Sequence, residues 1–326
     1  MSHILVSSFK PKGLCLPLLT KSKLITKIYK TMSKYLITGA TGGLGSSAIH
    51  HLAKDVAASE IAVLVRDADS EKAKSYKENG YELRIADYDN KAALVEAFKN
   101  IEALYFVSGS AISSREPQHK NVIEAAKEAA VKHVVYTSAG RKDESQNSPV
   151  AVVMDAHIKT ENWLKQSGLD YTILRHNLYA EVVSMFLGDK DALLRSKTIF
   201  LPTEAGKTAF ALRDDLAEAG ATVLKNYTEH TNKIYTLDGP EAIDFKEIAS
   251  IVSSITKEEI TYVSPEAETF TSTMATYGVP EEAIGIMLTF SNGIAAGEFN
   301  SESNDLEDLL GRKPKSLSAL LKQVYG

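Results

Sequence analysis

One glycine-rich stretch constrains the fold of this chain more than any other feature. Residues 39–45, with the sequence GATGGLG, follow an apolar run at 35–38 that suits a buried strand. Apolar residues then recur with helical spacing from Leu44 to Leu52. The heptad alone is compatible with an ordinary tight turn. Strand, glycine-rich turn and helix together favour a loop that holds a dinucleotide.

The physical reason lies in the backbone. Glycine adopts angles closed to other residues and lets the main chain approach a ligand closely. The helix that begins in the loop directs unpaired N–H groups and the positive end of its dipole at an anion. The predicted phosphate-binding residues are Gly39, Thr41, Gly42, Gly43, Leu44 and Gly45.

Composition narrows the class of protein. The 326 residues are 44% hydrophobic and 24% charged, which is typical of a globular chain. No apolar run reaches the length of a membrane span. Cys15 is the only cysteine, which excludes an internal disulfide and a thiolate metal cluster and favours a reducing compartment. No spacing of histidines and carboxylates indicates a metal site.

Charge is unevenly distributed. Residues 1–33 carry six lysines and no acid; without those six, 31 basic residues face 42 acidic ones, so residues 34–326 carry −11. Such a body is not expected to bind nucleic acid by charge. The first 33 residues are typical of a mitochondrial presequence except that they lack arginine, and a reading frame over-extended upstream of Met32 explains them equally well. We expect a cytoplasmic protein, or a mitochondrial one if the presequence is genuine.

From residue 34 onward, strand and helix patterns alternate. Further strands are predicted at 61–65, 81–85, 103–107, 133–137 and 170–174, with helices at 70–79, 91–100, 117–130 and 155–167. Buried strands that are each followed by a helix indicate an α/β fold with a doubly wound parallel sheet of the Rossmann type. We assign residues 34–180 to this NAD(P)-binding domain.

The rhythm changes after residue 180. Strands are predicted at 200–202, 233–237 and 260–263, and helices at 213–226, 244–254 and 317–324. We interpret residues 181–326 as a smaller, mostly helical lobe that covers the substrate, and we allow for some of its elements returning to the Rossmann sheet.

Cofactor type is indicated at the end of the second strand. Arg66 lies 21 residues beyond Gly45, where an acid would bind the ribose of NAD and an arginine suits the 2′-phosphate of NADP. Such a charge-assisted bond is worth ~1.5–3 kcal/mol, enough for a clear cofactor preference. The alternative is an ordinary surface arginine, with Asp67 beside it.

Other polar residues follow the remaining strands, where ligands of parallel sheets bind. Asp87 and Tyr88 are placed to meet the adenine edge. A run of small residues at 108–110 leaves room for the cofactor, and residues 137 and 138 lie near the expected nicotinamide. The predicted contacts in these two segments are Ser108, Gly109, Ser110, Thr137 and Ser138.

Several segments together resemble the NmrA-like branch of atypical short-chain dehydrogenases, and within it the bacterial-type NADPH:quinone reductases. They are GATGGLG at 39–45, VRD at 65–67, ADY at 86–88, PQHKNV at 117–122, YTS at 136–138, DAH at 155–157, YTILR at 171–175 and LLGRKP at 309–314. The resemblance runs from about residue 34 to the end. It implies a Rossmann-type domain, a small C-terminal lobe and bound NADPH. Because the family mixes enzymes with cofactor sensors, it does not decide between them.

Standard short-chain dehydrogenases move a proton with a Tyr-x-x-x-Lys pair, and none of the fourteen tyrosines here has a lysine four residues on. Ketone reduction by that device is therefore disfavoured. A quinone makes a smaller demand, because its reduced anion is stable enough to take a proton from water.

Three residues are candidates for contact with the acceptor. His157 lies where related reductases have a lysine, and it either orients a carbonyl or forms hydrogen bonds within the fold. Asn177 follows the sixth strand and can bind the carboxamide or the acceptor. Tyr179 either stacks on a flat ring or belongs to the core of the second lobe.

The favoured hypothesis is therefore an NADPH-dependent reductase of quinones or similar conjugated carbonyls, with a small-molecule substrate. The alternative is a sensor that binds NADP(H) without turnover and regulates a protein partner. Reduction of phenylpropanoid double bonds is less favoured, because lysine is missing at position 157. A homo-oligomer is compatible with the sequence.

Overall fold

A seven-stranded sheet runs through the computed structural model, which describes residues 33–326. The strand order is β3-β2-β1-β4-β5-β6-β8, and all neighbours are parallel. The strands are β1 Tyr35–Ile37, β2 Ile61–Val65, β3 Glu82–Ile85, β4 Ala103–Phe106, β5 His133–Ala139, β6 Asp170–His176 and β8 Lys233–Leu237. The predicted doubly wound parallel sheet is confirmed.

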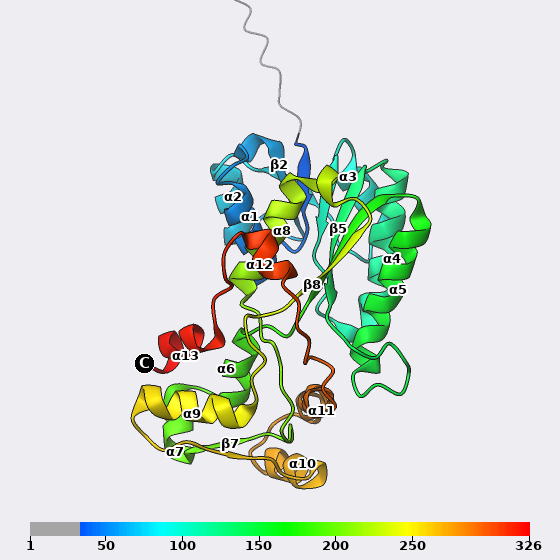
Figure 1. Ribbon diagram of the computed structural model, residues 1–326. Helices are drawn as coiled ribbons and strands as arrows, with labels where there is room; N and C mark the ends of the chain where they lie inside the picture. Colours follow the sequence, from blue (N-terminus) through cyan, green and yellow to red (C-terminus); the bar gives the residue numbers. More distant parts are fainter. Residues whose placement is uncertain (1–32) are drawn as a thin grey trace, which may run out of the picture. The chain divides into compact units, whose positions relative to one another are not determined.

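Helices cover both faces of this sheet, which is why the inner strands β1, β2 and β4 are apolar throughout. Figure 1 shows α1 and α8 on one side and α4 and α5 on the other. Successive residues of β1 divide between the faces: Tyr35 and Ile37 pack towards α1 and α8, and Leu36 packs towards α3 and α4. The helices are α1 Gly43–Leu52, α2 Glu71–Glu78, α3 Lys91–Phe98, α4 Ile112–Glu128, α5 Ala151–Ser167 and α8 Arg213–Lys225.

Three elements of the predicted second lobe belong to the sheet and its helical layer: β8, α8 and the short helix α12, Asp305–Leu310, which packs on the other two. β8 pairs with β6 in register from Thr172↔Lys233 to His176↔Leu237. Helix α8 packs along α1, and a Cβ atom on its Gly220 would lie only 2.3 Å from the hydroxyl of Tyr105 in β4. The carboxyl ends of β6 and β8 therefore lie side by side, at the same edge of the sheet as the carboxyl ends of the other strands.

The remaining elements surround a separate hydrophobic cluster that includes Phe210, Phe245, Phe270 and Phe299. A two-stranded parallel sheet, β7 with β9, belongs to this part. The elements are α6 Glu181–Leu187, α7 Lys190–Ser196, β7 Thr198–Phe200, α9 Phe245–Thr256, β9 Thr261–Val263, α10 Ala267–Thr276, α11 Glu281–Ala295 and α13 Leu317–Tyr325.

Three predicted boundaries are wrong. Helix α4 begins at Ile112, so Pro117 lies inside the helix instead of opening it. Helix α5 begins at Ala151, four residues before the predicted start. Strand β7 lies at Thr198–Phe200, two residues before the predicted 200–202, because it pairs with β9 in that register. Pro202 has no N–H to donate to such a ladder.

The hypotheses for residues 1–33 concern a segment outside the described residues, except for Ser33. Among the helices of residues 33–326, none is long and apolar enough to cross a membrane. The same residues contain no group of three or more His, Cys, Asp or Glu side chains that could hold a metal ion.

Candidate functional site

The glycine-rich loop folds back on itself directly after β1. Gly39 has a φ of +59°, and its carbonyl accepts the N–H of Gly42 at 2.9 Å. A Cβ atom on Gly45 would lie 2.3 Å from the same carbonyl oxygen, so no larger residue fits there without moving the loop. Glycine is thus required for the turn and for the close packing of the loop on α1.

Two side chains of helix α2 form hydrogen bonds with carbonyls of this loop. The Tyr76 hydroxyl donates to the carbonyl of Ala40, and Nζ of Lys72 donates to that of Thr41, both at 2.7 Å. The first amides of α1, at Gly43 and Leu44, have no acceptor within the helix. No side chain caps α1, and its first turn contains no acid. Free amides, exposed glycine and a positive helix end fit the pyrophosphate of a dinucleotide.

The end of β2 presents one cation. The side chain of Arg66 is exposed and has no hydrogen bond or ion pair with any residue from 33 to 326. Its neighbour Asp67 turns its carboxylate back on its own loop and accepts the amide of Asp69 at 2.8 Å. The acid that made the cofactor preference ambiguous is therefore engaged locally, and Arg66 is free to meet an anion. This chemistry fits the 2′-phosphate of NADP.

Asp87 and Tyr88 follow β3 and close the adjacent part of the site. The Tyr88 hydroxyl lies 2.8 Å from the carbonyl of Val107 and 2.5 Å from Oγ1 of Thr38, so it ties the ends of β3, β1 and β4 together. Asp87 accepts the amide of Asp89 at 3.0 Å. Both polar groups have partners within the fold, and what they leave open to a ligand is the half-buried ring of Tyr88.

Side chains of neighbouring elements form hydrogen bonds with the backbone of the segment after β4, Ser108–Ser110. The amide of Ser108 donates to Oγ1 of Thr137 at 3.0 Å. Gly109 is held through both of its backbone groups: its N–H donates to Nε2 of His119, and its carbonyl accepts Nε of Arg115 at 2.8 Å. These bonds fix the path of the loop beside the glycine-rich turn, at the switch point of the sheet.

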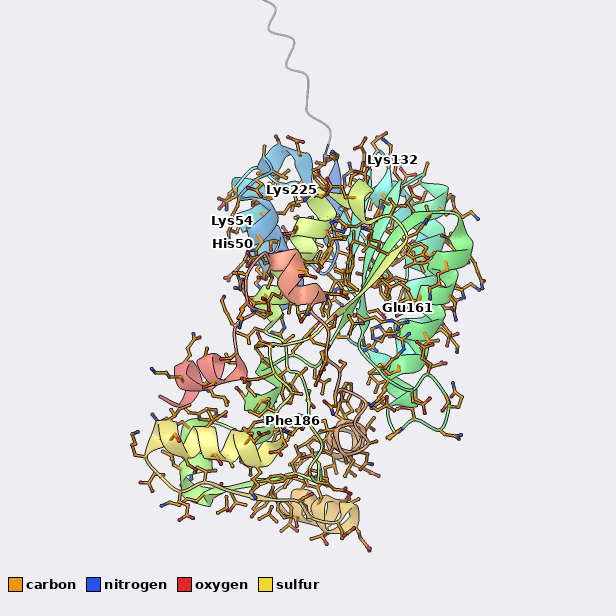
Figure 2. The ribbon with its side chains drawn as sticks, in the orientation of Figure 1. His50, Lys54, Lys132, Glu161, Phe186 and Lys225 are labelled. Atoms are coloured by element: carbon orange, nitrogen blue, oxygen red, sulfur yellow. The ribbon has the colours of Figure 1, made fainter. Side chains whose placement is uncertain are left out.

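Ser138 is part of a buried ion-pair cluster. Its hydroxyl donates to Oε1 of Glu161 at 2.6 Å, and Arg141 and Arg175 donate to the same carboxylate. Figure 2 labels Glu161 on α5. Burial alone would raise the pKa of Glu161, but the two guanidinium groups outweigh it and lower the pKa to about 2. Glu144 joins the cluster from the solvent side.

His157 lies on the buried face of α5, where both ring nitrogens have partners. Nδ1 lies 2.7 Å from the Tyr136 hydroxyl, and Nε2 lies 3.2 Å from Nη1 of Arg115. Burial, with the neighbouring guanidinium of Arg115, lowers the pKa of His157 well below its usual value. A neutral ring bonded at both nitrogens orients its neighbours and has no free polar atom for an acceptor.

Asn177 joins three segments at the end of β6. Its Nδ2 donates to Oδ1 of Asp238 at 2.8 Å and to the carbonyl of Phe299 at 3.1 Å, and its Oδ1 accepts the amide of Leu178. The side chain is 3% exposed. Its hydrogen bonds hold the end of β6 against β8 and the segment after α11.

Tyr179 lies half-buried between the two groups of elements. Its hydroxyl is 3.4 Å from Nδ1 of His176, and Arg213 lies over its ring, 5.0 Å from the ring centre. Burial raises the pKa of Tyr179 to about 12 despite the nearby cation. Tyr179 therefore contacts His176 and Arg213, whereas the polar atoms of His157 and Asn177 are bonded to partners within the fold.

Four residues that hold these loops were not among the predicted site residues: Arg115, His119, Arg141 and Glu161. They belong to α4, α5 and the loop after β5, and they meet only in the fold. One local signal was present. Glu161 follows His157 by four residues, which places both on one face of a helix.

The chain belongs to the NmrA-like family, whose sequence model matches residues 31–321. It is 34% identical to quinone oxidoreductase 2 of Escherichia coli over 289 residues, which cover 89% of this chain and 98% of that protein. It is 32% identical to an NmrA-like family domain-containing oxidoreductase of Aspergillus flavus, over 86% of this chain and 91% of that protein.

Solved structures agree with these relatives. The NADPH-dependent quinone oxidoreductase of Escherichia coli, crystallised with NADPH, matches with a TM-score of 0.82 and 33% identity over 90% of this chain and all of that chain. A triphenylmethane reductase of Citrobacter, crystallised with NADP(H), matches with a TM-score of 0.81 and 32% identity over 89% of this chain and 99% of that chain. These relationships support an oxidoreductase that uses NAD(P)H, as the resemblance implied.

Proposed function

We propose that this chain transfers hydride from NADPH to a quinone or a similar conjugated carbonyl. One combination supports the proposal most strongly. A glycine-rich loop with unpaired amides and the exposed Arg66 lie at neighbouring strand ends, in a chain 34% identical to a quinone oxidoreductase along nearly its whole length. The loop favours a dinucleotide, and Arg66 favours NADPH over NADH. The similarity to a quinone oxidoreductase favours a quinone as the hydride acceptor.

Bound NADPH would supply the hydride, and the protein would supply position. The amides of Gly43 and Leu44 would hold the pyrophosphate, and Arg66 would hold the 2′-phosphate. The fixed segment Ser108–Ser110 and Thr137 would line the path towards the end of β5. Holding donor and acceptor in reacting geometry is itself a large contribution to rate.

The pKa values around the strand ends favour an acceptor that needs no enzymic acid. Burial lowers the pKa of His157 and lowers that of His119 and His176 to about 3. It raises the pKa of Tyr136 and raises that of Tyr179 to about 12. All five shifts move away from neutrality, so these groups exchange protons poorly near pH 7. A quinol anion can take its proton from water.

His157 and Asn177 are positioning residues in this proposal. Their polar atoms are bonded to Arg115, Tyr136 and Asp238, and through these partners they fix the loops that line the site. Tyr179 offers the flat surface of a half-buried ring.

The test is a turnover assay with the full-length chain, NADPH and a small benzoquinone, followed by absorbance of the reduced cofactor. We expect oxidation that saturates with quinone and exceeds the reaction without protein. NADH should be used about tenfold less efficiently, because it lacks the 2′-phosphate. Tight binding of NADPH with no oxidation beyond the protein-free rate would contradict the proposal and favour the sensor.

A further inference from the structure

Arg213, the first residue of α8, lies against the glycine-rich loop. A Cβ atom on Gly43 would lie 3.1 Å from Nη1 of Arg213 and 3.2 Å from its Cδ. On its other side, Cζ of Arg213 lies 5.0 Å from the centre of the Tyr179 ring. The guanidinium therefore sits between the exposed amides of the loop and an aromatic face.

This guanidinium has no anionic partner among residues 33–326, although two acids share the first turn of α8 and a third contacts its backbone. Asp214 accepts Nζ of Lys315 at 2.9 Å, and Asp215 accepts the backbone amide of the same lysine at 2.5 Å. Glu181 accepts the backbone amide of Arg213, not its side chain, at 3.1 Å. Each nearby acid is thus committed elsewhere, and the side chain of Arg213 makes no hydrogen bond or ion pair with the described residues.

Electrostatics make this arrangement costly without an anion. Helix α1 begins at Gly43 and helix α8 begins at Arg213, so two positive helix ends flank one guanidinium. A cation in the first turn of a helix opposes the dipole, which favours acids there. The acids of the first turn of α8 are partly neutralised by Lys315. Such a local conflict is expected where a ligand resolves it.

We propose that Arg213 is a ligand of the cofactor pyrophosphate, acting beside the amides of Gly43 and Leu44. This inference rests on the dinucleotide binding of the proposed function. A guanidinium binds phosphate oxygens through two parallel N–H donors, and it adds a full positive charge to the partial charge of the helix end. Tyr179 positions the guanidinium through cation–π contact, so its ring contributes to cofactor binding as well as facing the acceptor.

Arg213 and Arg66 then read different parts of one ligand. NADPH and NADH share the pyrophosphate, whereas only NADPH carries the 2′-phosphate. Adenosine 2′-phosphate carries the second group without the first. Loss of Arg213 should therefore weaken both dinucleotides alike, and loss of Arg66 should weaken NADPH and adenosine 2′-phosphate.

The experiment is calorimetric titration of wild-type, Arg213→Gln and Arg66→Gln with all three ligands. For Arg213→Gln we expect the dissociation constants of NADPH and NADH to rise about tenfold or more, with adenosine 2′-phosphate within about twofold of wild-type. For Arg66→Gln, NADPH and adenosine 2′-phosphate should weaken and NADH should not. Lys315→Gln removes a positive charge near the same helix end and should leave all three within about twofold, because it does not touch the loop.

Other results of these titrations would contradict the inference or the proposed function. Dinucleotide binding by Arg213→Gln within twofold of wild-type overturns the inference and leaves the proposed function intact. Equal loss of adenosine 2′-phosphate in that variant, or equal loss of the dinucleotides in Lys315→Gln, also overturns it, since the effect would then be general. If wild-type protein binds neither dinucleotide, the proposed function itself fails.

Discussion

Arg115 makes several of the hydrogen bonds that fix the loops at the strand ends. Its Nε donates to the carbonyl of Gly109, and its Nη1 lies 3.2 Å from both the carbonyl of Val153 and Nε2 of His157. The side chain is 7% exposed, so these partners replace water almost completely. An arginine that is always charged keeps the facing histidine neutral, and the loop after β4 is held to α5 through that pair.

The depressed pKa of His157 makes stability depend on pH. In the unfolded chain the ring takes up a proton as pH falls through about 6.5, whereas in the folded protein its pKa lies well below that value. The contribution of the neutral His157 ring to the free energy of unfolding is therefore complete above about pH 6.5 and is lost as pH falls below that value. His157→Gln should reduce the slope of unfolding free energy against pH by about 1 kcal/mol per pH unit between about pH 5 and 6.

The measurement is chemical denaturation at a series of pH values in that window. His50→Gln is the matched control, because it removes an exposed histidine of α1 and leaves the buried contacts of His157 intact. An unchanged slope in His157→Gln would show that the ring is not held neutral by the fold.

Among single residues, spacing along the chain predicted only contacts between residues that lie close in sequence. Gly39, Gly42 and Gly45 meet within one turn, so their spacing was sufficient. Arg115 meets His157 across 42 residues, and Glu161 gathers arginines from the loop after β5 and from β6. Which charged residues become buried depends on packing between distant elements, and no local pattern encodes it.

Among the elements, α8 shows how a glycine inside a helix can be required. Its Gly220 faces the fully buried Tyr105, whose hydroxyl would lie 2.3 Å from a Cβ atom at that position. Gly285 in α11 also lies inside a helix, but nothing lies within 4 Å of a Cβ atom there. The same substitution should therefore have opposite effects at the two sites.

We expect Gly220→Ala to lower the free energy of unfolding by about 1–3 kcal/mol, because the tyrosine ring is enclosed and cannot move aside. Gly285→Ala should raise it by about 0.5–1 kcal/mol, through the lower entropy of the unfolded chain and better helix propensity. Denaturant titration of both variants tests the pair. Stabilisation by Gly220→Ala would mean that α8 can move away from β4.

Element positions were predictable where one force dominates. Apolar runs located the strands, because burial on both faces demands such runs. The start of α4 was not predictable, because Pro117 is also a favoured first-turn residue and the preceding Ser113 and Ser114 weaken the helical pattern. Packing settles the matter: Arg115, in the first turns of α4, anchors that turn to Gly109.

For the molecule as a whole, the return of the chain to the sheet brings the site together. After α6, α7 and β7, the chain comes back through α8 and β8, so Arg213 and Asp238 reach the strand ends from the second half of the sequence. A strand pattern at 233–237 predicts a strand but does not say which neighbour it joins. That choice is made by long-range pairing with β6.

Asn177 is the point where these parts are joined. Its side chain holds Asp238 after β8 and the carbonyl of Phe299 after α11, and all of these atoms are buried. Asn177→Ala should lower the free energy of unfolding by about 2–3 kcal/mol, because it leaves several buried polar groups unpaired. Asn300→Ala, in the same segment but exposed, should change it by less than about 0.5 kcal/mol. Denaturation and steady-state kinetics of Asn177→Ala together decide the role of Asn177. Full stability with a much lower kcat would mean that its amide contacts the reactants directly. Lost stability with a raised KM identifies it as the residue that holds the two halves of the site in place.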